Sequence, residues 1–297
     1  MRVRVRSNAT LLLAFLSAAG ALQVFDNVIL KKTREGLHLV ASEGGLSHRL
    51  LDRSRPPSSP LERALVEILD EMDDFSPYIE YWCRQEWRHI EAHADVDEFL
   101  AKSGRKQFRY PIHGHVLYLQ LGEHVKGPTC IFEECVSGGD LVAKSDVSLV
   151  TIPAVEGRLL RFPGNLLHAV PRPTDIWLLP FVQGSPDFNP KLFGRSVVLF
   201  NTWQEPPLDV PKLEEKLECL SQEISVVPRS DWDKVPIIER VASDVEGSST
   251  RAKIWLLGDL TRRNHTMRTV HLYAKQEELR DALEQPEKPY RTIFHAV

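Results

Sequence analysis

The chain lacks an excess of basic residues. Lys and Arg number 37 against 41 Asp and Glu, which gives a formal net charge of −4 over 297 residues. Proteins that bind nucleic acid usually carry a basic excess. The charge balance therefore predicts no nucleic-acid partner. A hydrophobic content of 42% is ordinary for a soluble globular chain and argues against a largely disordered one.

Several common motifs are also missing. The sequence contains neither G-x-G-x-x-G nor G-x-x-x-x-G-K-[ST], so a doubly wound nucleotide-binding fold has no support. The four cysteines include no C-x-x-C pair and lack the spacing of a zinc motif. They are compatible with one or two disulfides, such as Cys130–Cys135, and equally with buried thiols. Beyond the N-terminal segment no apolar run reaches ~18 residues, so we expect no membrane span in the mature protein.

The first 22 residues have the layout of a signal peptide. A basic region with Arg2, Arg4 and Arg6 precedes an apolar stretch over residues 9–22, and small residues follow one another at 17–21. This pattern is typical of a cleavable targeting segment, although an uncleaved anchor or an organelle presequence has similar features. The sequence thus predicts entry into the secretory pathway, with the endoplasmic reticulum lumen, secretion or an organelle beyond it as the destination.

The predicted secondary structure changes along the rest of the chain. Residues 23–87 are predicted to form an N-terminal helical support, because Ser59, Pro60 and Glu62 make a capping signal before apolar residues at helical spacing. Residues 88–204 alternate short β-rich runs with glycine and proline turns, which indicates an antiparallel sandwich or barrel. The expected strands cover residues 115–121, 129–132, 149–152, 158–162, 166–170, 176–181 and 196–203.

The last segment carries no catalytic constellation. After Glu205-Pro206-Pro207, residues 205–297 are predicted to form a small α+β extension. Helices are expected at 211–224 and 275–284, and strands at 253–257 and 269–273. The predicted fold class is therefore mainly β with flanking helices: a jelly-roll core plus this extension.

A cluster of metal-binding residue types lies near residue 93. His93-x-Asp95 would place an imidazole and a carboxylate on the same face of a β-strand, since residues i and i+2 share a face. Such a pair supplies two ligands of a 2-His-1-carboxylate facial triad, which binds iron(II) and leaves positions open. His168, in a strand-like run after a turn, is the best third ligand. A helix through 86–99 is the alternative, and it would separate His93 from Asp95.

A buried cation would complete such a site. A facial triad used for oxygen chemistry commonly shares its iron with an α-keto acid, whose far carboxylate needs a cation, preferably a bidentate one. Arg195 begins a β-branched strand, and Ser196 beside it could add a hydroxyl.

At these residues the sequence resembles the iron(II)/2-oxoglutarate-dependent dioxygenases, particularly the prolyl 4-hydroxylase-like branch. The resemblance spans roughly residues 80–203: HxD at His93 and Asp95, a distal His168, then Arg195 opening the last core strand. It implies a double-stranded β-helix holding Fe(II) between those three ligands, with 2-oxoglutarate bound by Arg195 and Tyr118. It also implies dioxygen as reactant, succinate and CO2 as products, and ascorbate as a further candidate cofactor. The resemblance fits a peptidyl substrate or a small-molecule substrate.

One departure from the family pattern concerns the spacing. Arg195 follows His168 by 27 residues, where the family usually has about ten, so residues 171–194 resemble an inserted loop at the barrel rim. Arg172 and Lys191 are therefore alternative anchors, and Asp97 is the alternative carboxylate ligand.

The sequence is also compatible with other sites and functions. His113-Gly114-His115 is a second metal-capable pair. The main rival function is a non-catalytic jelly-roll binding module, cupin-like or lectin-like. A zinc hydrolase has less support, because no general base is evident.

Overall fold

The computed structural model describes most of the chain. The described residues are 22–43, 48–87, 90–103, 108–123, 125, 127–136, 147–170, 190–212, 224–241, 250–256, 268–274 and 288–294. The predicted signal peptide at 1–22 lies outside them except for Leu22, and so stays a prediction. The expected strand at 176–181 and helix at 275–284 also lie outside, as does most of the expected helix at 211–224. Among the described residues no helix combines the length and apolar character needed to cross a bilayer.

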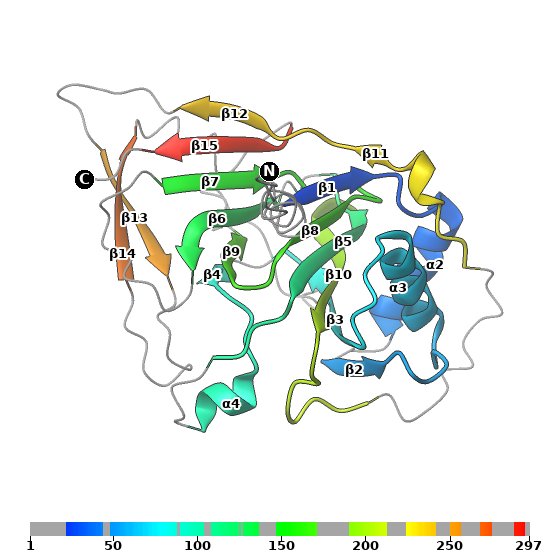
Figure 1. The fold of residues 1–297 in the computed structure, drawn as a ribbon. Coiled ribbons are helices and arrows are strands. Elements are labelled where there is room, and N and C mark those ends of the chain that lie inside the picture. Colours follow the sequence, from blue (N-terminus) through cyan, green and yellow to red (C-terminus); the bar gives the residue numbers. More distant parts are fainter. Residues whose placement is uncertain are drawn as a thin grey trace, which may run out of the picture.

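Two β-sheets form the body of the protein (Figure 1). The first has the order β11-β1-β8-β5-β10-β3-β2 and the second the order β12-β15-β7-β6-β9-β4-β13-β14. The strands of the first sheet are β1 (Gln23–Asp26), β2 (Arg49–Asp52), β3 (Tyr78–Glu86), β5 (His113–Leu121), β8 (Leu159–Pro163), β10 (Gly194–Trp203) and β11 (Asp233–Lys234). Those of the second are β4 (Ile90–His93), β6 (Thr129–Val136), β7 (Val147–Ile152), β9 (Leu166–Val170), β12 (Ile238–Val241), β13 (Thr250–Leu256), β14 (Arg268–Ala274) and β15 (Tyr290–Phe294).

The strand order is that of a double-stranded β-helix. Consecutive strands from β3 to β10 alternate between the sheets, except that β6 and β7 form a hairpin within one sheet: β3, β5, β8 and β10 lie in the first sheet, while β4, β6, β7 and β9 lie in the second. Apolar side chains from the facing strands meet between the sheets, including Val116, Tyr118 and Val197 on one side and Ile131 and Val150 on the other. The predicted jelly-roll core is thus confirmed.

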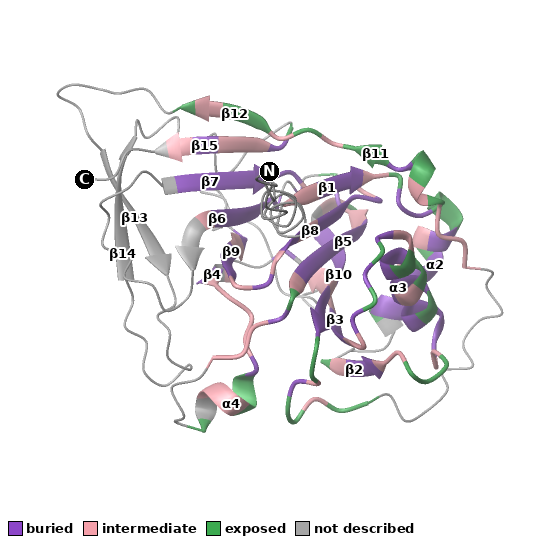
Figure 2. Ribbon diagram, in the orientation of Figure 1, coloured by how far each residue is buried: buried purple, intermediate pink, exposed green. Residues whose placement is uncertain are grey.

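Helices cover the outer face of the first sheet. The helices are α2 (Lys31–Glu43), α3 (Pro60–Glu71), α4 (Glu98–Lys102), α5 (Pro190–Phe193) and a 3₁₀ turn at Arg229–Asp231. α2 and α3 pack with Leu117, Val198 and Phe200 of that sheet in a second buried cluster and lie beside it in Figure 1. Figure 2 shows β5, β8 and β10 as buried strands between this helical layer and the barrel interior. Because both faces are covered, these strands carry apolar side chains on both sides.

The predicted helix start is present in detail. The Ser59 hydroxyl accepts a hydrogen bond from the Glu62 backbone N–H at 3.1 Å, and Pro60 occupies the first turn of α3. The Glu62 carboxylate in turn accepts a bond from the Ser58 N–H at 2.6 Å, so the reciprocal bond of the capping box reaches one residue further back than usual. The helix ends at Glu71, close to its expected end near Asp73.

The sheets extend beyond the predicted segment boundaries at 88 and 204. β3, from the segment assigned to helical support, pairs with β10 along eight registered positions. β11 pairs with β1, and β15 pairs with β7, so the C-terminal segment also adds strands to both sheets. Hydrophobic alternation within a segment does not reveal such long-range pairing, and these strands add area to the core sheets rather than forming a separate layer.

Candidate metal centre

The two strands that carry the predicted histidines lie next to each other. β4 pairs antiparallel with β9, and His93 and His168 are register partners. Their ring centroids are 4.4 Å apart. β4 ends at His93, and Asp95 lies in the irregular segment that follows, so the two ligands do not lie on one continuous strand as their spacing predicts.

The three side chains converge on one point. His93 Nε2 lies 3.6 Å from Asp95 Oδ1, and His168 Nε2 lies 3.8 Å from Asp95 Oδ2. One donor atom from each residue falls within 4.8 Å of the others. Ligand bonds of about 2.0–2.2 Å would bring neighbouring donor atoms to about 3 Å, which small rotations of the imidazoles supply. Two imidazoles and one carboxylate are a donor set suited to iron(II).

His168 has the protonation state that a metal ligand requires. Burial, followed by the positive charge of His93, lowers the pKa of His168 to about 4, although Asp95 opposes the shift. The imidazole is therefore neutral at pH 7. Its Nδ1 lies 3.3 Å from the Leu166 carbonyl oxygen, which can only accept a hydrogen bond. The proton therefore resides on Nδ1, and the lone pair of Nε2 faces Asp95.

Asp95 is held in place from the first sheet. The Asn201 side-chain amide donates a hydrogen bond of 3.0 Å to Asp95 Oδ2. Burial acts to raise the pKa of Asp95, but electrostatic interaction with His168 and then with His93, together with the Asn201 bond, outweighs it, so the pKa lies below its usual value. Asn201 was not predicted as a site residue. Its polar side chain directly after the apolar run Val197–Phe200 is the only sequence signal for it.

Asp97, the alternative ligand, has a different role. Its side chain is fully buried, caps α4 by accepting from the Leu100 N–H at 3.0 Å, and forms an ion pair with Arg109. The Leu208 N–H also donates to Asp97 at 3.0 Å. These donors occupy the carboxylate, so it ties the loop after Asp95 to the segment after β10 instead of binding metal.

Arg195 is a buried cation that has no carboxylate partner in the described part of the chain. Its exposed fraction is 2%, and its Nε donates to the Gly127 carbonyl at 3.1 Å. Among the described residues no carboxylate pairs with it, and Nη2 has no hydrogen-bond partner. Its guanidinium carbon lies 5.2 Å from the centre of the Tyr118 ring. Burial lowers the pKa of Arg195, an effect that Tyr118 partly offsets. An unpaired buried charge is costly, so this group fits an anionic ligand.

The neighbours of Arg195 add further polar groups. The Ser196 hydroxyl is buried and has no partner among the described residues. The Tyr118 hydroxyl lies 2.6 Å from the Thr129 hydroxyl. Gly127 leaves room here, because a Cβ at that position would lie 2.8 Å from Trp87 Nε1 and 3.0 Å from Arg195 Cδ. Of the alternative anchors, Arg172 lies outside the described residues, and Lys191 is exposed on α5.

An open pocket of about 900 Å³ is formed mainly by the residues that precede β5, together with the turn between β8 and β9 and the segment after β10. Its lining includes Arg109, Asn165 and Glu205 together with apolar and aromatic side chains from residues 100–112. Asn165 is in the turn that leads to His168, and Arg109 pairs with Asp97 next to the metal-binding loop. The volume is sufficient for a drug-sized molecule or part of a peptide.

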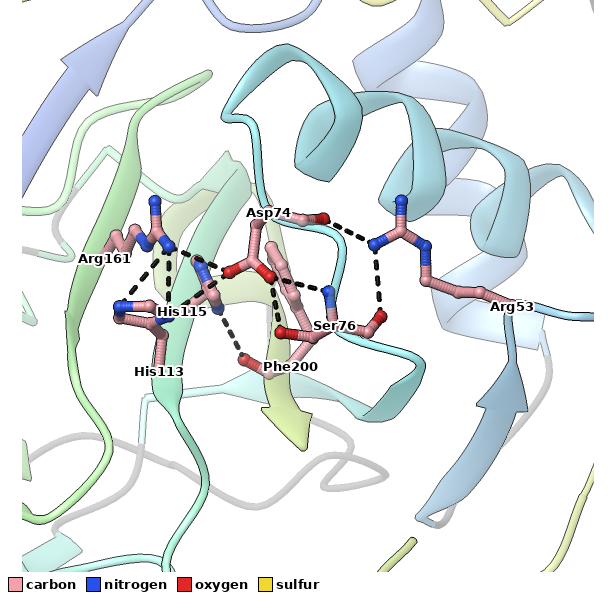
Figure 3. A network of polar contacts seen from close by, with 7 residues as sticks. All are labelled: Arg53, Asp74, Ser76, His113, His115, Arg161 and Phe200. Carbon is pink, nitrogen blue, oxygen red and sulfur yellow. Dashed lines mark hydrogen bonds and ion pairs between the residues drawn. The ribbon is translucent and has the colours of Figure 1, made fainter. Parts of the chain in front are cut away.

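The second histidine pair faces away from the candidate metal centre. His113 and His115 point to the outer face of β5, where Figure 3 shows them with Asp74 and Arg161. Asp74 pairs with His113 at 3.2 Å and with Arg161 at 2.8 Å. Burial, then the charges of Arg161 and His113, lower the pKa of His115 well below its usual value, and its ring stacks on Phe200. The group joins the loop after α3 to the sheet.

Comparisons with known proteins find solved structures whose chains follow a similar path. No protein-family model and no curated protein matches the sequence. Among solved structures, a prolyl-4-hydroxylase from Pseudomonas putida is 12% identical, covering 70% of this chain and 99% of its own, with a TM-score of 0.39. Iron-bound HygX from Streptomyces hygroscopicus is 12% identical over 76% of this chain and 99% of its own, also with a TM-score of 0.39.

A third solved structure is an oxidoreductase of the 2OG-Fe(II) oxygenase family from Burkholderia pseudomallei. It is 9% identical over 72% of this chain and 98% of its own, with a TM-score of 0.36. At these identities and scores the likenesses concern the path of the chain and assign neither activity nor ligand. The fold and the site together define a double-stranded β-helix in which a His-Asp-His triad lies within one barrel.

Proposed function

We propose that this protein is an Fe(II)- and 2-oxoglutarate-dependent dioxygenase that hydroxylates a substrate and releases succinate and CO2. The observation that carries the proposal is the pairing of two features in one barrel. One is a convergent set of His93, Asp95 and His168. The other is the buried Arg195, which has an unpartnered Nη2 and no carboxylate among the described residues.

In such a reaction different residues would bind the iron, orient its carboxylate ligand and bind 2-oxoglutarate. His93, Asp95 and His168 would hold the iron, and Asn201 fixes the orientation of the carboxylate ligand. Arg195 would bind the distal carboxylate of 2-oxoglutarate, and Ser196 is placed to add a hydroxyl. When bound, iron and 2-oxoglutarate together supply the activation of dioxygen for C–H oxidation. The apolar barrel interior around Tyr118 and Val197 excludes water from that chemistry.

The test is succinate formation from 2-oxoglutarate by purified protein supplied with Fe(II) and dioxygen. We expect succinate and CO2 in equal amounts, abolished in His93→Ala and in Arg195→Met. A matched control is His38→Gln on α2, which lies in the helical layer and should leave turnover unchanged. A protein that binds Fe(II) and still neither binds nor consumes 2-oxoglutarate would support the non-catalytic binding module in its place.

We also propose that the protein enters the secretory pathway, on the basis of the signal-peptide layout of residues 1–22. A fluorescent fusion of the full chain should enter the endoplasmic reticulum, and the same fusion beginning at residue 23 should not. Identical distribution of the two fusions would contradict the proposal.

A further inference from the structure

A second buried donor lies beside Arg195 in the barrel. Trp87 directly follows β3 and is 6% exposed. Its indole Nε1 has no hydrogen-bond partner among the described residues, and the same is true of Arg195 Nη2. A buried donor that is left unsatisfied is unfavourable and rare in native proteins. Two such donors beside each other indicate a binding site for a group that accepts hydrogen bonds.

Gly127 brings the two donors to one place. A Cβ at position 127 would lie 2.8 Å from Trp87 Nε1 and 3.0 Å from Arg195 Cδ, so both side chains adjoin the space that a side chain at this position would fill. The Gly127 carbonyl also accepts the Arg195 Nε–H at 3.1 Å. This bond holds the arginine against the glycine. The indole N–H and the guanidinium therefore form one group of donors around Gly127.

Trp87 also lies on the side of the first sheet that faces the triad. It packs with Leu121 and Val170 in a small apolar cluster, and Leu121 is the register partner of Arg195. Val170 follows His168 by two residues on β9, so the two side chains share a face of the strand and are about 6.6 Å apart along it. A ligand that extends from the triad to Arg195 would therefore end beside the Trp87 indole.

The chemistry of these donors suits a carboxylate. Guanidinium and indole nitrogens donate hydrogen bonds and accept none. The guanidinium of Arg195 carries a positive charge, and Trp87 adds a neutral N–H, so the pair favours an anion with two acceptor oxygens over a cation or an apolar group. The apolar side chains around the indole lower the local dielectric, which strengthens a hydrogen bond made there.

We propose that Trp87 is a second binding residue for the distal carboxylate of 2-oxoglutarate. The indole Nε1 would donate to one carboxylate oxygen, and Arg195 would donate to the other. The inference rests on the proposed function and adds a residue to the same site. It predicts that Trp87 contributes to affinity through the distal carboxylate of the ligand, and not only through packing against its carbon chain.

The test measures ligand affinity by titration calorimetry in the full-length protein loaded with Zn(II), which is redox-inactive and so prevents turnover. The ligands are 2-oxoglutarate and 2-oxopentanoate, which has the same carbon chain with a methyl group in place of the distal carboxylate. Wild type is compared with Trp87→Phe, Arg195→Met and Trp232→Phe. Trp232 is the matched control, because its side chain is as well buried, at 7% exposed, and packs in the cluster of the helical layer.

We expect Trp87→Phe to weaken 2-oxoglutarate binding about ten-fold, which corresponds to the loss of one hydrogen bond to a charged group. Arg195→Met should also weaken it. The affinity of Trp87→Phe for 2-oxopentanoate should equal that of wild type, and Trp232→Phe should bind both ligands as wild type does. Equal losses for the two ligands would assign Trp87 a packing role and overturn the inference. An unchanged affinity of Trp87→Phe for 2-oxoglutarate would also overturn it.

The indole ¹H–¹⁵N signal of Trp87 gives a second readout that requires no variant. It is identified by cross-relaxation with the methyl protons of Val125 and Val170, which pack in the same cluster. In the Zn(II)-loaded protein 2-oxoglutarate should move this indole proton downfield, and 2-oxopentanoate should not. If 2-oxoglutarate binds in an Arg195-dependent way while the Trp87 signal stays in place, this inference alone fails. If wild type binds no 2-oxoglutarate, the proposed function fails.

Discussion

Replacing Arg195 with methionine should affect stability and ligand binding in opposite ways. The guanidinium is 2% exposed and has no carboxylate partner among the described residues, so the folded chain bears a desolvation cost of several kcal/mol. The substitution removes that cost. It also loses the bond to Gly127, worth about 1.5–3 kcal/mol for a charged donor, and the contact with the Tyr118 ring, worth about 2 kcal/mol when desolvated.

These contributions nearly cancel. We therefore expect the free energy of unfolding of Arg195→Met to lie within about 1 kcal/mol of wild type, or above it. The ligand response should differ sharply. A ligand at 100 times its dissociation constant stabilises the folded state by about 2.7 kcal/mol. With Fe(II) under nitrogen, 2-oxoglutarate should stabilise wild type by about this amount and Arg195→Met by almost nothing.

Urea denaturation of both proteins, with and without 2-oxoglutarate, measures all four values. The reasoning fails if Arg195→Met loses more than about 3 kcal/mol without ligand, since the arginine would then be a structural residue whose charge is satisfied. It also fails if 2-oxoglutarate stabilises the variant as much as wild type. His38→Gln serves as the control, because its site on α2 is far from the barrel interior.

Three further outcomes are expected. Asn201→Ala removes the donor to Asp95 and should weaken Fe(II) binding about 10–100-fold in an anaerobic titration while the fold is retained; unchanged affinity would show that Asp95 is oriented by other groups. Asp74→Asn should cost about 3 kcal/mol at pH 7 because it leaves Arg161 buried without its partner. Burial acts to raise the pKa of Asp74, but His113, Ser76 and Arg161 outweigh it, so the pKa in the folded state lies below the unfolded value of about 3.9. The Asp74 carboxylate therefore stabilises the fold fully above that value and loses its effect as the pH falls through the lower folded pKa. The urea midpoints of wild type and Asp74→Asn should converge below about pH 4, and a gap that stays constant with pH would contradict this linkage. Ser59→Ala should reduce the free energy of unfolding by about 1 kcal/mol through loss of the α3 cap, whereas Ser54→Ala in the exposed turn should have little effect.

Local signals in the sequence were sufficient for part of the fold. The capping residues before α3 and the turn-punctuated runs from β5 to β10 follow from short-range patterns, and the structure contains these elements. α2 was not predicted, because its apolar residues Leu37, Val40 and Ala41 are few among charged neighbours. β3 was missed for the opposite reason: helices cover one of its faces and the barrel region the other, so hydrophobic alternation is weak.

Some residues of the candidate site could also be predicted from local sequence, and others could not. His93, Asp95, His168 and Arg195 could be named because their residue types and order point to one chemistry, and the structure brings the first three together. Asn201 could not, since its contact with Asp95 depends on which strands become neighbours. The pairing of β10 with β3 joins residues about 120 positions apart, and no local pattern specifies that register.

The central claim is that one barrel binds iron through its triad and 2-oxoglutarate through Arg195. The most direct measurement is iron-dependent conversion of 2-oxoglutarate to succinate by wild type, His93→Ala, Arg195→Met and His38→Gln in parallel. We predict turnover in wild type and His38→Gln and none in the other two. Turnover that persists in His93→Ala, or an iron-loaded wild type that leaves 2-oxoglutarate untouched, would contradict the claim.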